Sequence, residues 1–178
     1  MMLRQAASIK TVQLTQTELL AARDRYLANA REKAREQAAF HAGERIAKGD
    51  LRPSNLTPIM KWKSPRPIGL IRGNLGKEVR EALKFATTAR TARVAVSVLC
   101  GPRGVNIPVT SAILTAIFPD RFTVIDYRAL ESLGVKMNAL TLNYYLVYLD
   151  YCRGTAAQYG LTLRDLDRAL WQTSKDAT

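Results

Sequence analysis

Residues 104–126, GVNIPVTSAILTAIFPDRFTVID, combine a turn, an apolar helix and a lone carboxylate. The stretch begins with a turn and continues as an apolar helix, which Pro108 opens. It then passes through the short extended piece RFTVI and ends on Asp126. A carboxylate before a helix is an ordinary N-cap, because its oxygen accepts a free backbone N–H. Asp126 therefore has two interpretations, a helix cap and a reactive carboxylate in a basic protein.

The composition predicts one globular domain with a basic surface. The chain has 178 residues, of which 47% are hydrophobic, enough for a sizeable core in a single domain over 1–178. The net charge is +12, from 27 Lys and Arg against 15 Asp and Glu. This charge is spread along the chain and favours a polyanionic partner, most commonly nucleic acid. Basic surfaces also bind acidic proteins and anionic membranes, so charge alone does not identify the partner.

Other features of the sequence exclude several classes of protein. The longest apolar runs, such as VAVSVLC, are too short to span a bilayer. The N-terminus MMLRQAASIK lacks the apolar core of a signal peptide, so we expect a cytoplasmic, nucleoid-associated protein. Cys100 and Cys152 lie far apart with no CxxC motif, which argues against a disulfide framework, a zinc site and an iron–sulfur site. No heptad seam is present, and we expect a monomer.

The pattern is helical throughout and predicts an all-α fold. Thr15 and Glu18 form a capping box that opens one long N-terminal helix over 15–48. Residues 49–74 contain four prolines and are predicted as a loop-rich connection with one short helix. Asn74 is expected to cap the next helix. Further helices are expected over 75–89, 91–100, 108–118, 126–133, 141–159 and 162–174.

The segment 92–134 combines two helices joined by the turn GPRGVN. A glycine-containing hairpin exposes backbone N–H groups, and the second helix adds the positive end of its dipole. Together they can hold a phosphate without reading the base sequence. The candidate phosphate-binding residues are Gly101, Arg103, Gly104, Asn106 and Ile107.

Residues 94–134 resemble the helix-hairpin-helix superfamily of DNA glycosylases, which includes endonuclease III, 8-oxoguanine glycosylase and the alkylpurine glycosylases. The pair Gly104-Val105 matches the GV of the family's LPGVG hairpin. Asp126 falls at the place of the family's catalytic aspartate, at the start of the next helix and directly after TVI. The resemblance implies a compact multi-helix domain that binds DNA and excises a damaged or modified base.

The implied reaction suits an acid at this position. Cleavage of an N-glycosidic bond builds positive charge on the deoxyribose, as in the oxocarbenium-like state of sugar hydrolysis. A carboxylate beside the anomeric carbon stabilises that charge and can orient the attacking water. The target nucleotide must first be flipped out of the duplex. We therefore interpret Asp126 as the catalytic residue.

The departures from the family pattern refine this interpretation. Members that also cleave the strand carry a lysine four residues beyond the first hairpin glycine, where this chain has Pro108. We therefore expect a monofunctional hydrolase that leaves an abasic site. Asn106 replaces the second hairpin glycine, and Arg103 replaces the usual proline. The four-cysteine cluster is absent, so no iron–sulfur cluster is expected. The family's monovalent cation would fall at the carbonyls of residues 101, 104 and 106.

Side chains outside the hairpin have competing interpretations. Trp62 lies between lysines in MKWKSPR, which suits either a nucleic-acid contact or a plug in the core. Tyr144, Tyr148 and Tyr151 could stack on a base, but a stripe at helical spacing is more typical of a core. The candidate DNA or base contacts are Lys61, Trp62, Lys63 and Arg66.

Two other functions remain open at the level of the sequence. A non-catalytic DNA-binding protein could keep the hairpin and lack a working active site. An RNA-binding or ribosome-associated protein would bind RNA more tightly than duplex DNA. Substitution of Asp126 by Asn separates catalysis from capping, since asparagine caps a helix as well as aspartate does.

Overall fold

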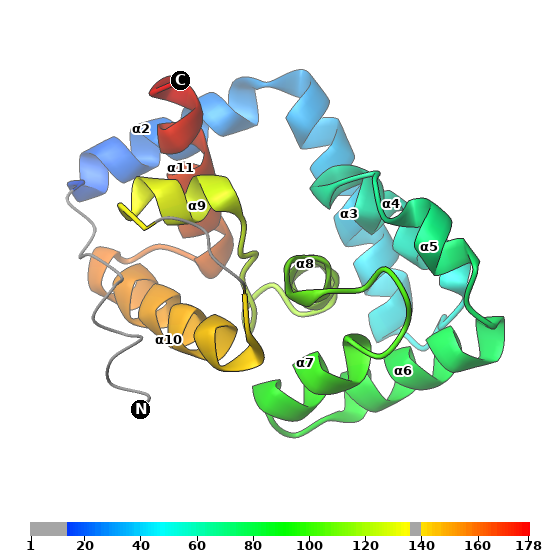
Figure 1. The fold of residues 1–178 in the computed structure, drawn as a ribbon. Helices are drawn as coiled ribbons and strands as arrows, with labels where there is room; N and C mark the ends of the chain where they lie inside the picture. The colour runs from blue at the N-terminus through cyan, green and yellow to red at the C-terminus, as the bar shows by residue number, and fades with distance from the viewer. Residues whose placement is uncertain (1–13, 136–139) are drawn as a thin grey trace.

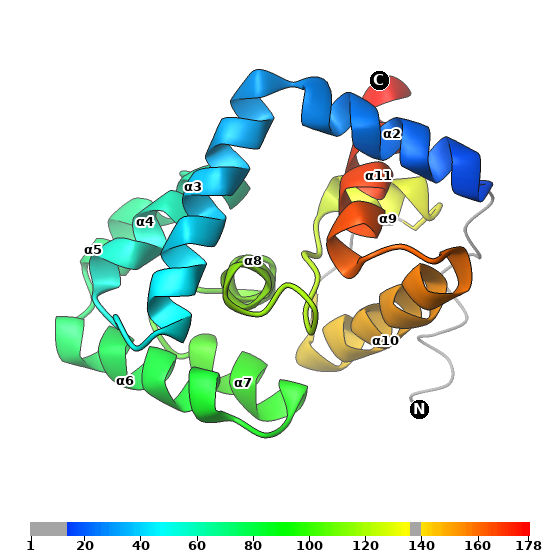
Figure 2. The same ribbon diagram turned by 180° about the vertical axis from the view of Figure 1, so that it is seen from behind.

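The computed structural model describes residues 14–135 and 140–178, and these residues form helices with no strand. Helix α8 (Ile107–Ile117) lies at the centre, with α3 to α7 on one side and α2, α9, α10 and α11 on the other (Figures 1 and 2). The all-α prediction is confirmed for this part of the chain. The other helices are α2 (Gln16–Ala28), α3 (Ala30–Ala47), η1 (Pro53–Asn55), α4 (Leu56–Lys63), α5 (Ile68–Arg72), α6 (Gly76–Thr88), α7 (Ala92–Leu99), α9 (Tyr127–Ser132), α10 (Leu142–Tyr159) and α11 (Leu163–Asp176).

The segment predicted as one long helix over 15–48 is instead two helices that meet at Asn29. The capping box of Thr15 and Glu18 is present as predicted. Asn29 ends α2 with an extended backbone and caps α3, because its side chain accepts the N–H of Glu32 at 3.2 Å. Asparagine bonds to nearby backbone groups more readily than it continues a helix. The chain therefore turns here, and α2 and α3 can reach opposite sides of α8.

The proline-rich connection holds more helix than expected. It contains η1, α4 and α5, where the sequence predicted one short helix. Asn74 does not cap α6, which begins after Leu75. Its side chain instead accepts the N–H of Arg103 at 2.8 Å and donates to the Arg103 carbonyl at 2.9 Å. This contact across 29 residues fastens the α5–α6 connection to the turn between α7 and α8.

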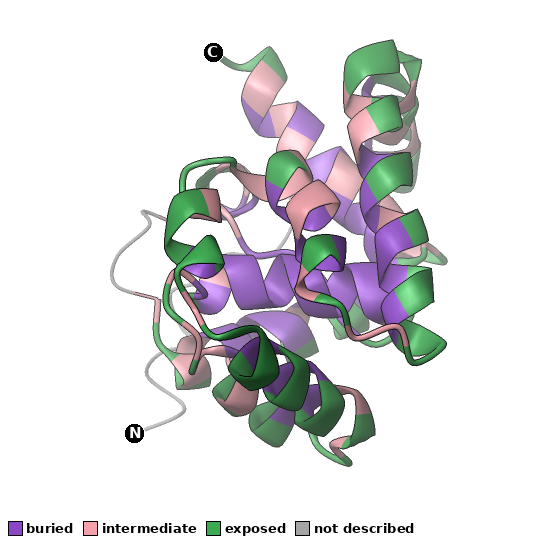
Figure 3. Cartoon of the chain, turned by 90° about the vertical axis from the view of Figure 1, so that its right-hand side faces the viewer, coloured by how far each residue is buried: buried purple, intermediate pink, exposed green. Residues whose placement is uncertain are grey.

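Helix α8 forms the centre of the core because eight of its eleven side chains are apolar and all except Pro108 are buried. Figure 3 shows the buried residues inside the molecule and the exposed ones on the outer faces of the helices. Helix α3 crosses α8 at Gly43, where an added Cβ would lie 2.0 Å from the carbonyl oxygen of Ala116. Glycine is therefore required by the close approach of the two backbones. No helix among the described residues is long and apolar enough to cross a membrane.

Helix α10 positions the extended segment that leads to Asp126. The hydroxyl of Tyr145 donates to the carbonyl of Thr123 at 2.9 Å, and that of Tyr148 donates to the carbonyl of Val124 at 3.2 Å. Both tyrosines are completely buried. The prediction that this stripe belongs to the core is confirmed for Tyr148, while Tyr144 and Tyr151 are partly buried and pack against the core. Tyr145 is a core residue outside the predicted stripe.

Candidate functional site

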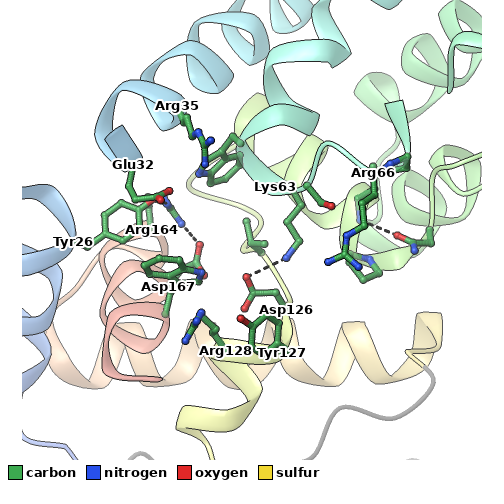
Figure 4. Close-up of a pocket in the computed structure, with 18 of the residues that line it drawn as sticks. Tyr26, Glu32, Arg35, Lys63, Arg66, Asp126, Tyr127, Arg128, Arg164 and Asp167 are labelled. Carbon is green, nitrogen blue, oxygen red and sulfur yellow. Dashed lines mark hydrogen bonds and ion pairs between the residues drawn. The ribbon is translucent and has the colours of Figure 1, made fainter. Parts of the chain in front are cut away.

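A pocket of about 590 Å³ opens between the two sides of the molecule, beside α8 (Figure 4). Its wall comes from segments far apart in the sequence, including α2, α3, α4, α9 and α11. Five basic and three acidic side chains contribute to it, together with four aromatic rings, two of which are tryptophans. The charged residues are Arg35, Lys63, Arg66, Arg128, Arg164, Glu32, Asp126 and Asp167.

Asp126 lies in this pocket, at the N-terminus of α9. One carboxylate oxygen, Oδ1, accepts the N–H of Ala129 at 3.0 Å, so the predicted cap is confirmed. The other, Oδ2, lies 3.1 Å from the Nζ of Lys63. The preceding residue is also fixed, because the N–H of Ile125 donates to the Ser111 hydroxyl at 3.1 Å. The carboxylate is thus held in one place and faces the pocket, as Figure 4 shows.

The candidate contacts of the MKWKSPR segment divide between the pocket and the surface. Trp62, Lys63 and Arg66 line the pocket, whereas Lys61 is exposed and is not part of its wall. Trp62 also packs edge-on against Phe40, with ring centroids 5.6 Å apart. The Trp62 ring therefore packs against the core, as one interpretation predicted, and it also forms part of the pocket wall. The nucleic-acid contact stays a prediction.

The α7–α8 turn, residues 100–106, borders the pocket at Asn106. Gly104 has a φ of +84°, and a Cβ added to it would lie 2.8 Å from the Cβ of Leu70. Asn106 caps α8, because its side chain accepts the N–H of Val109 at 3.2 Å. Glycine at 104 therefore serves both the turn and the close approach of α5.

The backbone N–H groups of the turn differ in their partners. The N–H of Arg103 is already used by Asn74. Within the described residues, the N–H groups of Gly104, Asn106 and Ile107 donate to no protein acceptor. The Ile107 side chain is buried. Of the five predicted phosphate-binding residues, these three thus have a backbone N–H without a protein acceptor among the described residues. Gly101, the remaining predicted phosphate-binding residue, is exposed but donates its N–H to Val98.

Helix α11 supplies the part of the pocket that the sequence analysis did not assign. Arg164, Asp167 and Trp171 line the wall, and the guanidinium of Arg164 lies 4.9 Å from the Trp62 ring centroid. Arg164 pairs with Asp167 of the same helix. It also pairs with Glu36 of α3 at 2.6 Å, which no local pattern reveals.

Two carboxyl groups of this cluster have pKa values shifted from their ordinary values. Burial raises the pKa of Asp167 to about 6, although Arg164 acts in the opposite direction. Burial alone would also raise the pKa of Glu36, but Arg164 and Arg168 outweigh it and lower that pKa to about 2. A neutral Asp167 can donate a hydrogen bond into the pocket and an ionised one can only accept.

No known family model, curated protein or solved structure matches the chain significantly. The described residues contain no group of three or more His, Cys, Asp or Glu side chains that could hold a metal ion. The pocket and the α7–α8 turn are therefore the features from which a function can be inferred.

Proposed function

We propose that this protein is a DNA glycosylase that hydrolyses the N-glycosidic bond of a damaged or modified base. The observation that carries the proposal is the position of Asp126, held in an open pocket that borders the α7–α8 turn. The turn offers donors to a DNA phosphate, and the pocket would receive the flipped nucleotide. The carboxylate would then lie beside the sugar whose bond breaks.

The size and lining of the pocket support a single nucleotide as the ligand. Its volume of about 590 Å³ is in the range of small-molecule sites, roughly 300–1,000 Å³. Tyr26, Trp62 and Trp171 supply aromatic rings. Stacking on such rings suits any of the bases. The net charge of +12 favours DNA over a neutral ligand.

Hydrolysis requires stabilisation of the sugar cation and a water molecule on its open face. Asp126 would stabilise the cation and take a proton from the water. Its Oδ1 remains bonded to Ala129, and its Oδ2 pairs with Lys63. Pro108 also lines the pocket, so the residue at the family's lysine position offers no amine. Base removal by hydrolysis is therefore the proposed first reaction, with an abasic site as its product.

The test is base release from duplexes that each carry one lesion: uracil, 8-oxoguanine, an alkylated purine, hypoxanthine or a bulky modified cytosine. Abasic sites are scored by alkali cleavage for the wild type and for Asp126→Asn. Because general acid–base groups contribute about 10²–10⁴-fold, release should fall by about 100-fold or more in the variant. Asparagine keeps the cap of α9, so thermal stability and DNA binding should change little.

A non-catalytic DNA-binding protein is the second candidate. The observation in its favour is that both oxygens of Asp126 already have protein partners, as they would in a purely structural cap. Under this alternative, no lesion is released by the wild type, and salt-sensitive DNA binding is the same in the wild type and in Asp126→Asn.

A further inference from the structure

We propose a second activity for the pocket: Lys63 acts as an amine nucleophile toward the aldehyde of an abasic deoxyribose, and the protein cleaves DNA at abasic sites. The inference rests on the proposed function only in taking DNA as the ligand of the pocket, and it does not require base release. The resemblance predicted no strand cleavage, because Pro108 occupies the position of the usual amine. The pocket receives an amine from another helix.

The position of Lys63 differs from that of a lysine at the surface. It is the last residue of α4, and its side chain is only 11% exposed. Of the described residues that line the pocket, it is the one lysine. Figure 4 shows its amine directed toward Asp126. Lys61 of the same helix is exposed by comparison.

The ion pair does not join two helices that are packed together. Helix α4 packs against α3 and α8, whereas α9 packs against α11. The 3.1 Å contact between Lys63 and Asp126 therefore spans the pocket rather than closing a helix interface. A partly buried ion pair seldom stabilises a fold more than apolar side chains of the same size would. Its place across an open pocket is better explained by chemistry than by stability.

The reaction is balanced without an oxidant or a metal. The proton of the Lys63 ammonium passes to Asp126, and the neutral amine adds to C1′ of the open-chain aldehyde. Asp126 returns the proton to the carbinolamine hydroxyl, which leaves as water, and an iminium ion forms. The Asp126 carboxylate then removes a proton from C2′. The C3′–O bond breaks, and its electron pair leaves with the phosphate. Water hydrolyses the conjugated iminium to an unsaturated aldehyde and regenerates the lysine ammonium, while Asp126 loses its proton to solvent.

Asp126 would thus act in both reactions, and Lys63 only in the second. The distance of 3.1 Å allows the proton to pass directly between the two groups. The guanidinium of Arg164 over the neighbouring Trp62 ring helps to fix the end of α4, and with it the amine. The site needs no rearrangement of the backbone to bring the two reactive groups together.

The experiment uses the full chain and a duplex with a single preformed abasic site, treated with sodium borohydride to reduce any imine to a stable cross-link. Wild type, Lys63→Arg and Lys84→Arg are compared. Arginine keeps a positive charge opposite Asp126 but forms no such imine. Lys84 is exposed on α6, outside the pocket. The wild type and Lys84→Arg should be cross-linked, and Lys63→Arg should fall to the background level.

Mass spectrometry of the wild-type cross-link locates the modified lysine, so the test does not depend on folding of the variant. A cross-link at Lys63 supports the proposal. A cross-link at another lysine overturns it, as does the lack of any cross-link when the abasic duplex is bound. Cross-linking at Lys63 together with no release from the lesion panel would refute the proposed glycosylase and leave the lyase standing.

Discussion

The two sides of the pocket are held by different kinds of interaction. On the α8 side, the turn depends on local devices: Gly104 in a left-handed conformation, the Asn106 cap and the Asp126 cap. On the α11 side, Arg164 depends on Glu36, which is 128 residues away. The caps and the turn of the first side follow from neighbouring residues, although Asn74 also bonds to Arg103 of the turn. The ion pair of the second side forms only when the chain has folded.

The two sides of the pocket are therefore expected to have different roles. The short-range side presents the α7–α8 turn and Asp126, which would bind DNA and react with it. The long-range side fixes α11 against α3 and α2, and thereby sets the width of the pocket. Substitutions on the long-range side should therefore act mainly on stability, and those on the short-range side mainly on DNA binding and activity.

The largest effect is expected for Glu36→Gln, because it leaves Arg164 and Arg168 without their shared carboxylate. Loss of one partner from a buried ion pair should lower the free energy of unfolding by about 3 kcal/mol at pH 7. Urea unfolding of the wild type and of Glu36→Gln measures this difference in the free energy of unfolding.

The pH dependence of this difference tests its cause. The folded-state pKa of Glu36 is lowered from 4.5 to about 2. The stabilisation is therefore fully present above pH 4.5 and is lost as the pH falls toward 2. The difference in the free energy of unfolding between the wild type and Glu36→Gln should disappear between pH 4.5 and about pH 2. A difference that stays constant down to about pH 2 would show that the effect is not electrostatic.

The next largest effect is expected for Gly43→Ala. Helix propensity alone would favour alanine by about 1 kcal/mol. The new Cβ would lie 2.0 Å from the Ala116 carbonyl oxygen, and overpacking of this kind costs about 1–3 kcal/mol or more. We expect net destabilisation by about 2 kcal/mol in thermal unfolding, measured beside Gly154→Ala, where an added Cβ meets nothing within 4 Å. A stabilised Gly43→Ala would mean that α3 and α8 are not in close contact.

Gly104→Ala should combine a stability loss with a loss of DNA binding. A non-glycine residue at a φ of +84° costs about 1–3 kcal/mol. The added Cβ would also push Leu70 and the α7–α8 turn apart. We expect weaker binding of duplex DNA by fluorescence anisotropy at a temperature where the variant is folded. Unchanged affinity would remove the turn from the DNA interface.

The smallest effects on stability are expected for two helix caps, one at the pocket and one away from it. Asn106→Ala and Thr162→Ala each remove an N-cap, and each should cost about 1 kcal/mol of stability. Asn106 borders the pocket, whereas Thr162 does not line it. DNA affinity should therefore fall only for Asn106→Ala. Equal losses of affinity for both variants would contradict the assignment of the turn to DNA binding.

Much of the local structure could be predicted from the sequence, because caps and turns depend on adjacent residues. The Thr15 capping box, the Asp126 cap and the end of α10 at Gly160 were all predicted and are present. The break at Asn29 was missed because the mixed polar pattern continues through it. The expected role of Asn74 was wrong because its partner, Arg103, lies in another segment.

An all-helical, basic protein with a glycine turn before an apolar helix, and with an aspartate at the start of the next helix, could be predicted from the residue pattern alone. The physical reason is that helix periodicity, capping and backbone conformation act over a few residues. Only the tertiary structure placed Lys63 3.1 Å from Asp126 and joined Glu36 to Arg164. Such contacts depend on how helices pack around α8, which a pattern of neighbouring residues does not contain.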